Sequence, residues 1–364
     1  MKTRIMILLS AIVLLNSACE RTLDFVGIDE EKASDVTISS VAVVGTPLIV
    51  YLSKANTIDE ATFNQYFYDI ASPPIKDSDN IDYYTNHYFR MVAISGAQVS
   101  VEVSGGKQYS LTFNESDYGY SGEYIPQEGD VINIKATVNG QEVTAQTSVP
   151  QKPTIEISDY EVIPGNPYKE INGYIYETDT IMRITCHIAK ENEKQYYRLR
   201  VRSERDAFEW LWYMGDKGSE KEKGQLTYHM QDVFFSDDKI FVDQRLTSNS
   251  GGWPPYFSNV FDDTLIGAGG YTFIVDSPKM PQELYAANSI TYSKEGNPPL
   301  PPRVMIELQS ISPELYHYLK SVELYRLTYN DAYAEPVQIY STVQNGWGIF
   351  GALSYDRHFV EYDP

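Results

Sequence analysis

The chain has 364 residues with 50 acidic and 29 basic side chains, which gives a formal net charge of −21 at pH 7. Binding to DNA or RNA by charge requires clustered Lys and Arg, so this balance excludes nucleic acid as an expected partner. The sequence has 30 Tyr against 14 Phe and 4 Trp. Because Tyr prefers strands and half-buried faces, this composition favours a β-rich protein.

Residues 1–18 have the pattern of a secretion signal. Two basic residues precede an apolar run at 5–15, and small residues at 17 and 18 lead to Cys19. The run is too short to span a bilayer. A cysteine at the cleavage point predicts lipidation of Cys19, with residues 19–35 as a polar tether and membrane contact through the lipid anchor only. The alternative is an ordinary signal peptide in which Cys19 has no special role.

Residues 36–153 have the pattern of an immunoglobulin-like β-sandwich. Polar and apolar residues alternate over Gln98–Val103, Tyr109–Phe113 and Val131–Ala136. Asn139-Gly140 is typical of a two-residue hairpin turn. Short strands at regular spacing with tight turns predict a sandwich, and 150–153 is expected to be a linker.

Residues 154–364 are expected to form a second, larger β-sandwich-like domain. Cys186 shares a strand face with Met182, Ile184 and Ile188, which predicts a buried, unreactive thiol. Residues 196–202 alternate apolar side chains with three arginines, so that one strand face is cationic. The charged segment Gly215–Gly224 is expected to be a loop.

One amphipathic helix is predicted near the C-terminus, at residues 313–327. Ser312 suits the N-cap, and Pro313 suits the first helical position. Apolar residues then recur at helical spacing from Leu315 to Tyr325. The helix is expected to pack across the end or edge of the second sheet.

The segment Asn249–Phe257 is the candidate contact site for a carbohydrate or peptide ligand. It presents Trp253, Tyr256 and Phe257 among glycines and prolines. Large aromatic side chains on a stiff loop can stack on a sugar or insert into a partner. The alternative is that these three side chains fold back and fill the open end of the second sandwich.

The C-terminal region resembles a known family. Residues 333–340 (YAEPVQIY), of which Val337–Ser341 is expected to be a strand, precede residues 344–351 (QNGWGIFG). Together with the predicted helix and the alternation of 96–150, they resemble a Bacteroidota lipoprotein family, domain of unknown function 4249. The resemblance implies a lipid-anchored outer-membrane protein, encoded beside TonB-dependent transporters, with no established activity and no catalytic residues to carry over.

The sequence holds no recognisable catalytic or metal-binding motif. None of the five His lies in a zinc-binding pattern, and no nucleophile elbow occurs. We therefore expect no cofactor, no metal site and no enzymatic activity. The expected function is accessory to a TonB-dependent transporter, by ligand capture or as a transporter partner. The alternatives are a structural or adhesive surface lipoprotein and, thirdly, a glycoside hydrolase.

Overall fold

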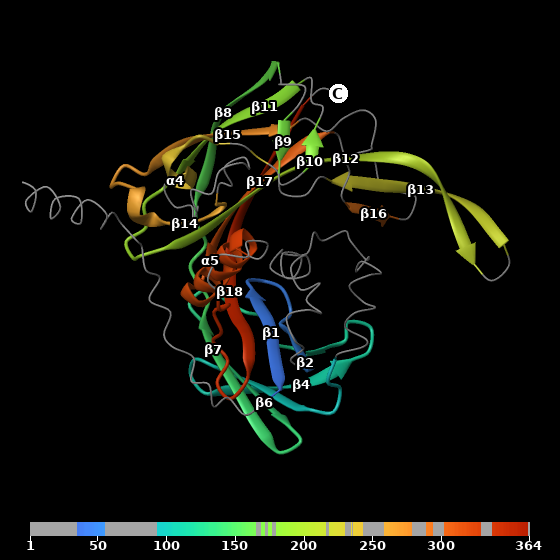
Figure 1. Ribbon diagram of the computed structural model, residues 1–364, viewed down its shortest axis with the longest axis vertical. Helices are drawn as coiled ribbons and strands as arrows, with labels where there is room; N and C mark the ends of the chain where they lie inside the picture. Colours follow the sequence, from blue (N-terminus) through green and yellow to red (C-terminus); the bar gives the residue numbers. More distant parts are fainter. Residues whose placement is uncertain are drawn as a thin grey trace, which may run out of the picture. The chain divides into compact units, whose positions relative to one another are not determined.

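Strands account for most of the described chain, so the protein is mostly β, as the sequence predicts (Figure 1). The computed structural model describes residues 35–54, 93–164, 169–171, 174–176, 180–215, 218–229, 234, 236–242, 258–278, 289–293, 302–328 and 337–362. Over 169–171, 174–176, 205–215, 218–229, 289–293 and 326–328, and at 278, only the backbone is described.

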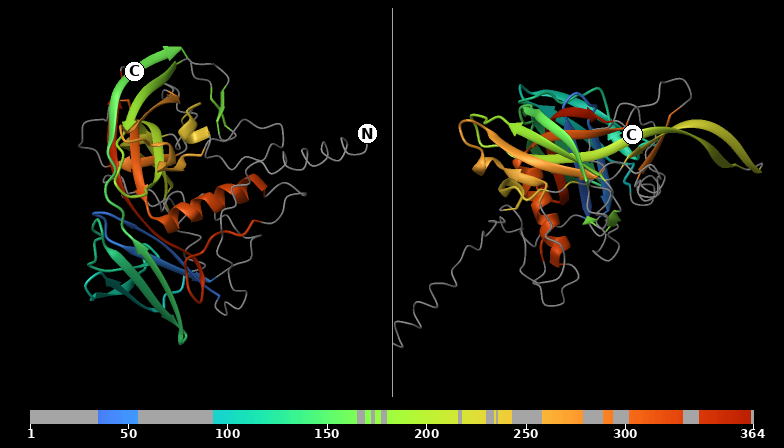
Figure 2. Two further views of the ribbon diagram at one scale, coloured as in Figure 1. Left: turned by 90° about the vertical axis from the view of Figure 1, so that its left-hand side faces the viewer. Right: turned by 90° about the horizontal axis from the view of Figure 1, so that it is seen from above.

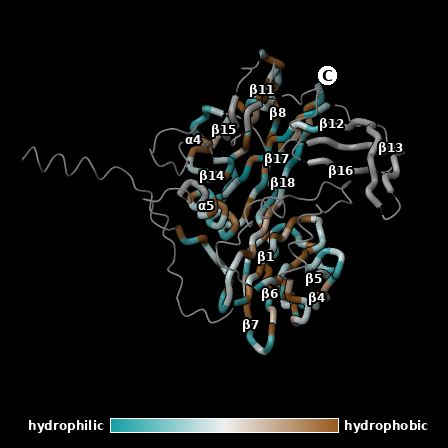
Figure 3. Tube along the Cα trace, turned by 45° about the vertical axis from the view of Figure 1, so that its right-hand side comes forward, coloured by the Kyte–Doolittle hydropathy of each residue, from teal (hydrophilic) through white to brown (hydrophobic). Residues whose placement is uncertain are grey.

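The N-terminal half of this region is a β-sandwich. Its strands are β1 (Val36–Val43), β2 (Ile49–Lys54), β3 (Gln98–Val103), β4 (Lys107–Asn114), β5 (Gly119–Ser121), β6 (Val131–Val138) and β7 (Gln141–Ser148). The strands pair in the order β1-β2-β5-β4-β3-β6-β7. The β6–β7 turn is at Asn139 and Gly140, which both have positive φ, as its sequence predicts. Figure 3 shows hydrophobic and hydrophilic residues alternating along these strands.

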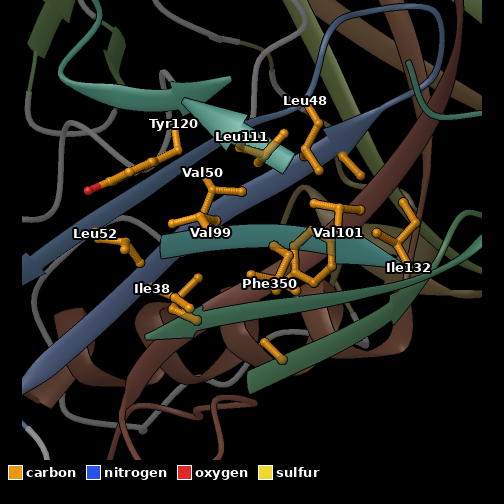
Figure 4. Close-up of a cluster of buried hydrophobic side chains, with 14 of the residues drawn as sticks. Ile38, Leu48, Val50, Leu52, Val99, Val101, Leu111, Tyr120, Ile132 and Phe350 are labelled. Carbon is orange, nitrogen blue, oxygen red and sulfur yellow. The ribbon is translucent and has the colours of Figure 1, made fainter. Parts of the chain in front are cut away.

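The core of this sandwich, the first core, is not contiguous in sequence. Ile38, Val101 and Ile132 form part of it, and they are fully buried. Phe350 and Ala352, from near the C-terminus, belong to the same cluster (Figure 4). The first core thus contains residues from beyond the expected domain 36–153. The domain boundary at residue 153 stays a prediction. The expected linker is also held in place, since Lys152 forms an ion pair of 2.9 Å with Asp356.

The second half contains two layers that enclose a second core. Its elements are β8 (Ile155–Pro164), β9 (Lys169–Ile171), β10 (Tyr174–Tyr176), β11 (Thr180–Ile188), β12 (Tyr196–Gly215), β13 (Gly218–His229), α4 (Lys239–Val242), β14 (Val260–Asp262), η2 (Asp263–Leu265), β15 (Tyr271–Pro278), β16 (Ser289–Ser293), β17 (Arg303–Ile311), α5 (Pro313–Thr328) and β18 (Trp347–Glu361). The sheet β15-β11-β8 packs on β12, β17 and β18 through side chains such as Ile184, Leu199 and Ile306. The expected loop Gly215–Gly224 is wrong, because Gly215 belongs to β12 and residues 218–224 belong to β13, which pairs with β12.

The predicted helix is present as α5, the orange-red helix in the left view of Figure 2. It is less amphipathic than expected, since Lys320 and Ser321 are buried along with Leu315, Leu319 and Val322. Its contacts extend further than the expected packing across the end or edge of the second sheet. The helix packs on β18, β14 and β12, and its cluster includes Val41 and Val43 of β1.

Strand β18 joins the two halves, because it pairs in parallel with β1 and antiparallel with β17. Gly348 has φ +104°, and a Cβ there would collide with the carbonyl oxygen of Ile38. A Cβ on Gly351 would lie 2.7 Å from the Cβ of Leu315 on α5. The glycines of the C-terminal signature thus permit close packing on both sides of β18. The expected strand Val337–Ser341 is wrong: its Tyr340 N–H donates to Ser321 of α5.

Candidate functional site

The residues predicted from sequence to carry function lie outside the described part of the chain. These are Cys19 for lipidation, and Trp253, Tyr256 and Phe257 for ligand contact. The described chain resumes at Ser258, directly after the aromatic segment. The assignments of all four therefore stay predictions.

The most unusual described feature is a set of polar side chains, most of them charged and buried, here called the charge ladder. Its members lie on one face of β12, β17 and β18: Arg198, Arg200, Arg202, Glu204, Arg303, Glu307, Gln309 and Arg357. Directly opposed residues of antiparallel strands share a face, so Arg200, Glu307 and Arg357 form one row across the sheet. The alternating residues of β12 and β17 face the second core instead.

Glu307 is at the centre of the ladder and is fully buried. Arg357 Nε donates to its Oε2 at 2.6 Å, and Gln309 Nε2 donates to its Oε1 at 2.7 Å. Arg200 Nη1 lies 3.9 Å from Oε1. These contacts come from all three strands and fix their mutual register, since a slip of one residue would place the carboxylate on the apolar side.

Glu204 is the second carboxylate at which arginines of the ladder meet, and it lies opposite Arg303 at the start of β17. Arg303 Nε donates to its Oε1 at 2.6 Å, and Arg202 Nη2 lies 3.6 Å from its Oε2. The Arg303 guanidinium stacks over the ring of Phe359, 3.9 Å from the ring centroid. Phe359 is 41% exposed, so this end of the ladder reaches the surface.

The ladder is suited to holding strands together. Both Glu204 and Glu307 are buried and have guanidinium donors on their carboxylate oxygens. The sequence pattern predicts the cationic face of β12 but not the acidic partners Glu204 and Glu307. The available signal was the alternation of Arg303, Glu307 and Gln309 with apolar residues along β17.

A second polar cluster connects α5 to Ser258, in the segment that leads into β14. Lys320 Nζ donates to Ser258 Oγ at 2.6 Å and lies 3.3 Å from Glu323 Oε2. Ser258 Oγ lies 2.8 Å from both the Glu323 carboxylate and the Val260 carbonyl oxygen. A serine beside a lysine can serve as a nucleophile and its base. Here both side chains are 2% exposed, which favours a structural tie between the helix and the chain entering β14.

The remaining described features are a buried thiol and a polar groove. Cys186 is fully buried in the second core, as predicted, and burial raises the pKa of its thiol to about 12. A shallow groove of about 330 Å³ crosses β3, β6 and β7 on the outside of the first sandwich. It is lined mainly by polar side chains, among them Glu102, Asn133 and Lys135.

Within the described residues, no group of three or more His, Cys, Asp or Glu side chains is arranged to hold a metal ion. In the same part of the chain, no helix has the length and apolar character required to cross a bilayer.

The comparisons with known proteins give one family and one distant structural match. No curated protein matches the chain. A crystal structure from Corynebacterium diphtheriae, described as a "Putative membrane anchored protein", aligns at 11% identity and a TM-score of 0.18, over 88% of this chain and 59% of the other. This chain thus spans less than two thirds of that protein's length. The family model described as "Domain of unknown function (DUF4249)" matches residues 23–358. The chain therefore belongs to the DUF4249 family, as its C-terminal signature predicts.

Proposed function

We propose that this protein is an outer-membrane lipoprotein, anchored through Cys19, that acts without catalysis as the partner of a TonB-dependent transporter. The observation that carries the anchor is the order of features at the N-terminus. The apolar run at 5–15 ends just before Cys19, and the region that matches the family begins at residue 23. A lipidated Cys19 would therefore lie just before the region that matches the family.

The described fold supports a binding role because its buried carboxylates and its buried Ser–Lys pair make structural contacts. Glu204 and Glu307 hold strand register, and Ser258 and Lys320 connect a helix to a strand. The transporter partnership itself comes from the resemblance to lipoproteins encoded beside such transporters. A capturing or capping protein needs a stable scaffold and an exposed contact surface, and two joined sandwiches supply the scaffold.

The anchor is tested by Cys19→Ser, with Cys186→Ala as the matched control. Incorporation of a labelled fatty acid and partition into detergent should both be lost in Cys19→Ser. Both should persist in Cys186→Ala, because Cys186 lies in the core. A Cys19→Ser protein that still partitions with the membrane would show that lipidation at this residue is wrong.

The partnership is tested separately on the lipidated full chain. Mild cross-linking in intact cells, followed by affinity purification and mass spectrometry, should recover one transporter in stoichiometric amount. Deleting that transporter's gene should abolish the cross-linked species without releasing the lipoprotein from the membrane. Recovery of abundant outer-membrane proteins in proportion to their copy number would contradict the partnership.

A further inference from the structure

The most informative surface outside the charge ladder is the end of the three-stranded sheet, at residues 159–164 of β8. We call this segment the β8 edge. The sheet order is β15-β11-β8, so β11 pairs with one side of β8, and no described strand pairs with the other side. Figure 1 shows β8 and β11 adjacent to each other, with β15 on the far side of β11. An open strand edge presents backbone N–H and C=O groups that another strand can pair with.

The β8 edge exposes apolar side chains on its inner face. Tyr160 is 53% exposed and Val162 is 49% exposed. Their direct neighbours across the sheet, Ile184 and Met182, are fully buried. At Tyr160 and Val162 the apolar face therefore extends beyond the second core, whereas Ile155 at the start of β8 belongs to that core. An added strand would extend this face and shield both side chains.

The outer face of the same edge is acidic. Asp159 and Glu161 are exposed there, and Glu161 lies opposite Arg183 of β11. Arg183 is already engaged by Asp276 of β15, through two hydrogen bonds of 2.8 and 2.9 Å. The two carboxylates of the β8 edge thus face any incoming strand with most of their charge uncompensated.

A second copy of this chain is a poor occupant. Two β8 edges paired antiparallel about a twofold axis at Tyr160 would place Asp159 opposite Glu161 twice, and like charges directly opposed are destabilising. The net charge of −21 adds to this repulsion. The β8 edge is limited to 159–164 because the β8–β11 register shifts near Ser158, and such an irregularity interrupts regular strand pairing.

We propose that the β8 edge binds a β-strand of another protein, in which apolar residues alternate with Lys or Arg. The apolar residues would lie beside Tyr160 and Val162, and the basic residues would lie opposite Asp159 and Glu161. This is strand addition, in which backbone hydrogen bonds give affinity and alternate side chains give specificity. It names the partner chemistry for the proposed binding role, and its test does not depend on the anchor or on a transporter.

The test uses the full chain carrying Cys19→Ser and a short blocked peptide in which Val and Arg alternate. Titration is followed by amide chemical shifts, which report both affinity and location. The peptide should shift amides of β8 and bind more weakly as salt rises. The variant Asp159→Lys/Glu161→Lys should bind it at least about tenfold more weakly and should now prefer a peptide of alternating Val and Glu.

A matched variant separates docking from general attraction between opposite charges. Glu115→Lys/Glu123→Lys makes the same charge change at two exposed residues of the first sandwich and should leave the affinity within about twofold. An N-methylated Val/Arg peptide, which cannot pair with a strand, should not bind. Equal loss in the matched variant, equal binding of the methylated peptide, or no binding of the Val/Arg peptide would each overturn the proposal. A failed anchor test would leave these results unchanged.

Discussion

At the scale of single residues, Cys186 is the clearest case in which environment decides reactivity. Its thiol is fully buried, and burial raises the pKa to about 12 from an ordinary 9.0. Because the thiolate is the reactive form, folded protein carrying Cys19→Ser should react with a maleimide at pH 8 about a hundredfold more slowly than unfolded protein. Fast labelling of the folded chain would contradict the burial.

The same thiol makes a stability prediction with a definite sign. A pKa raised on folding means that the folded state holds its proton more tightly than the unfolded state. The stabilising contribution is therefore complete below about pH 9 and is lost as pH rises towards about 12. Urea unfolding should show a steeper loss of stability above pH 9 in the parent chain than in Cys186→Ala. Parallel curves for the two proteins would contradict the linkage.

Gly348 is the glycine at which an added methyl group should lower the free energy of unfolding most. Its φ of +104° is unfavourable for other residues, and a Cβ would strike the Ile38 carbonyl oxygen of the paired strand. Gly348→Ala should lower the free energy of unfolding by more than about 2 kcal/mol. Gly267→Ala is the control, because a Cβ there meets nothing within 4 Å and φ is not positive. Similar urea midpoints for the two variants would refute the packing argument.

At the scale of elements, the charge ladder should be expensive to break at its centre. Glu307→Ala leaves the buried Arg200 and the partly buried Arg357 without the carboxylate they share, and the loss should be about 3–5 kcal/mol. The control is Glu142→Ala, which removes an exposed ion pair with Lys135 and should cost at most about 1 kcal/mol. Denaturant unfolding measures both. A small effect at Glu307 would mean that water or neighbours replace its contacts.

Local patterns in the sequence predicted the elements well where one rule dominated. The Asn139-Gly140 turn, the strand with Cys186 and the helix that begins at Pro313 are all confirmed. The errors came from tertiary contacts. The Tyr340 N–H of the expected strand 337–341 donates to Ser321 of α5, and the ladder pairs Arg303 with Glu204, which is 99 residues away in sequence. No local pattern encodes such distant pairing.

At the scale of the whole molecule, β18 contributes side chains to both hydrophobic cores. Phe350 and Ala352 belong to the first core, whereas Val360 and Tyr362 at its far end belong to the second. Ser312, fully buried at the start of α5, accepts from the Ala352 N–H and from Thr147 of the first sandwich. Residues 32–364 accordingly form one compact unit. The sequence shows strand-like alternation within 98–136 and gives no sign that this half depends on distant residues.

This arrangement predicts that the two halves unfold together. Phe350→Ala removes a fully buried ring from the first core, and Leu308→Ala removes a fully buried side chain from the second. Each should cost about 2–5 kcal/mol. If the halves are one cooperative unit, each variant should lower the amide-exchange protection of both β6 and β11 by a similar free energy. The isolated segment 36–153 should also remain unfolded, because it lacks the β18 side chains. Independent sandwiches would instead confine the effect of Phe350→Ala to β6, and 36–153 would then fold alone with dispersed amide signals.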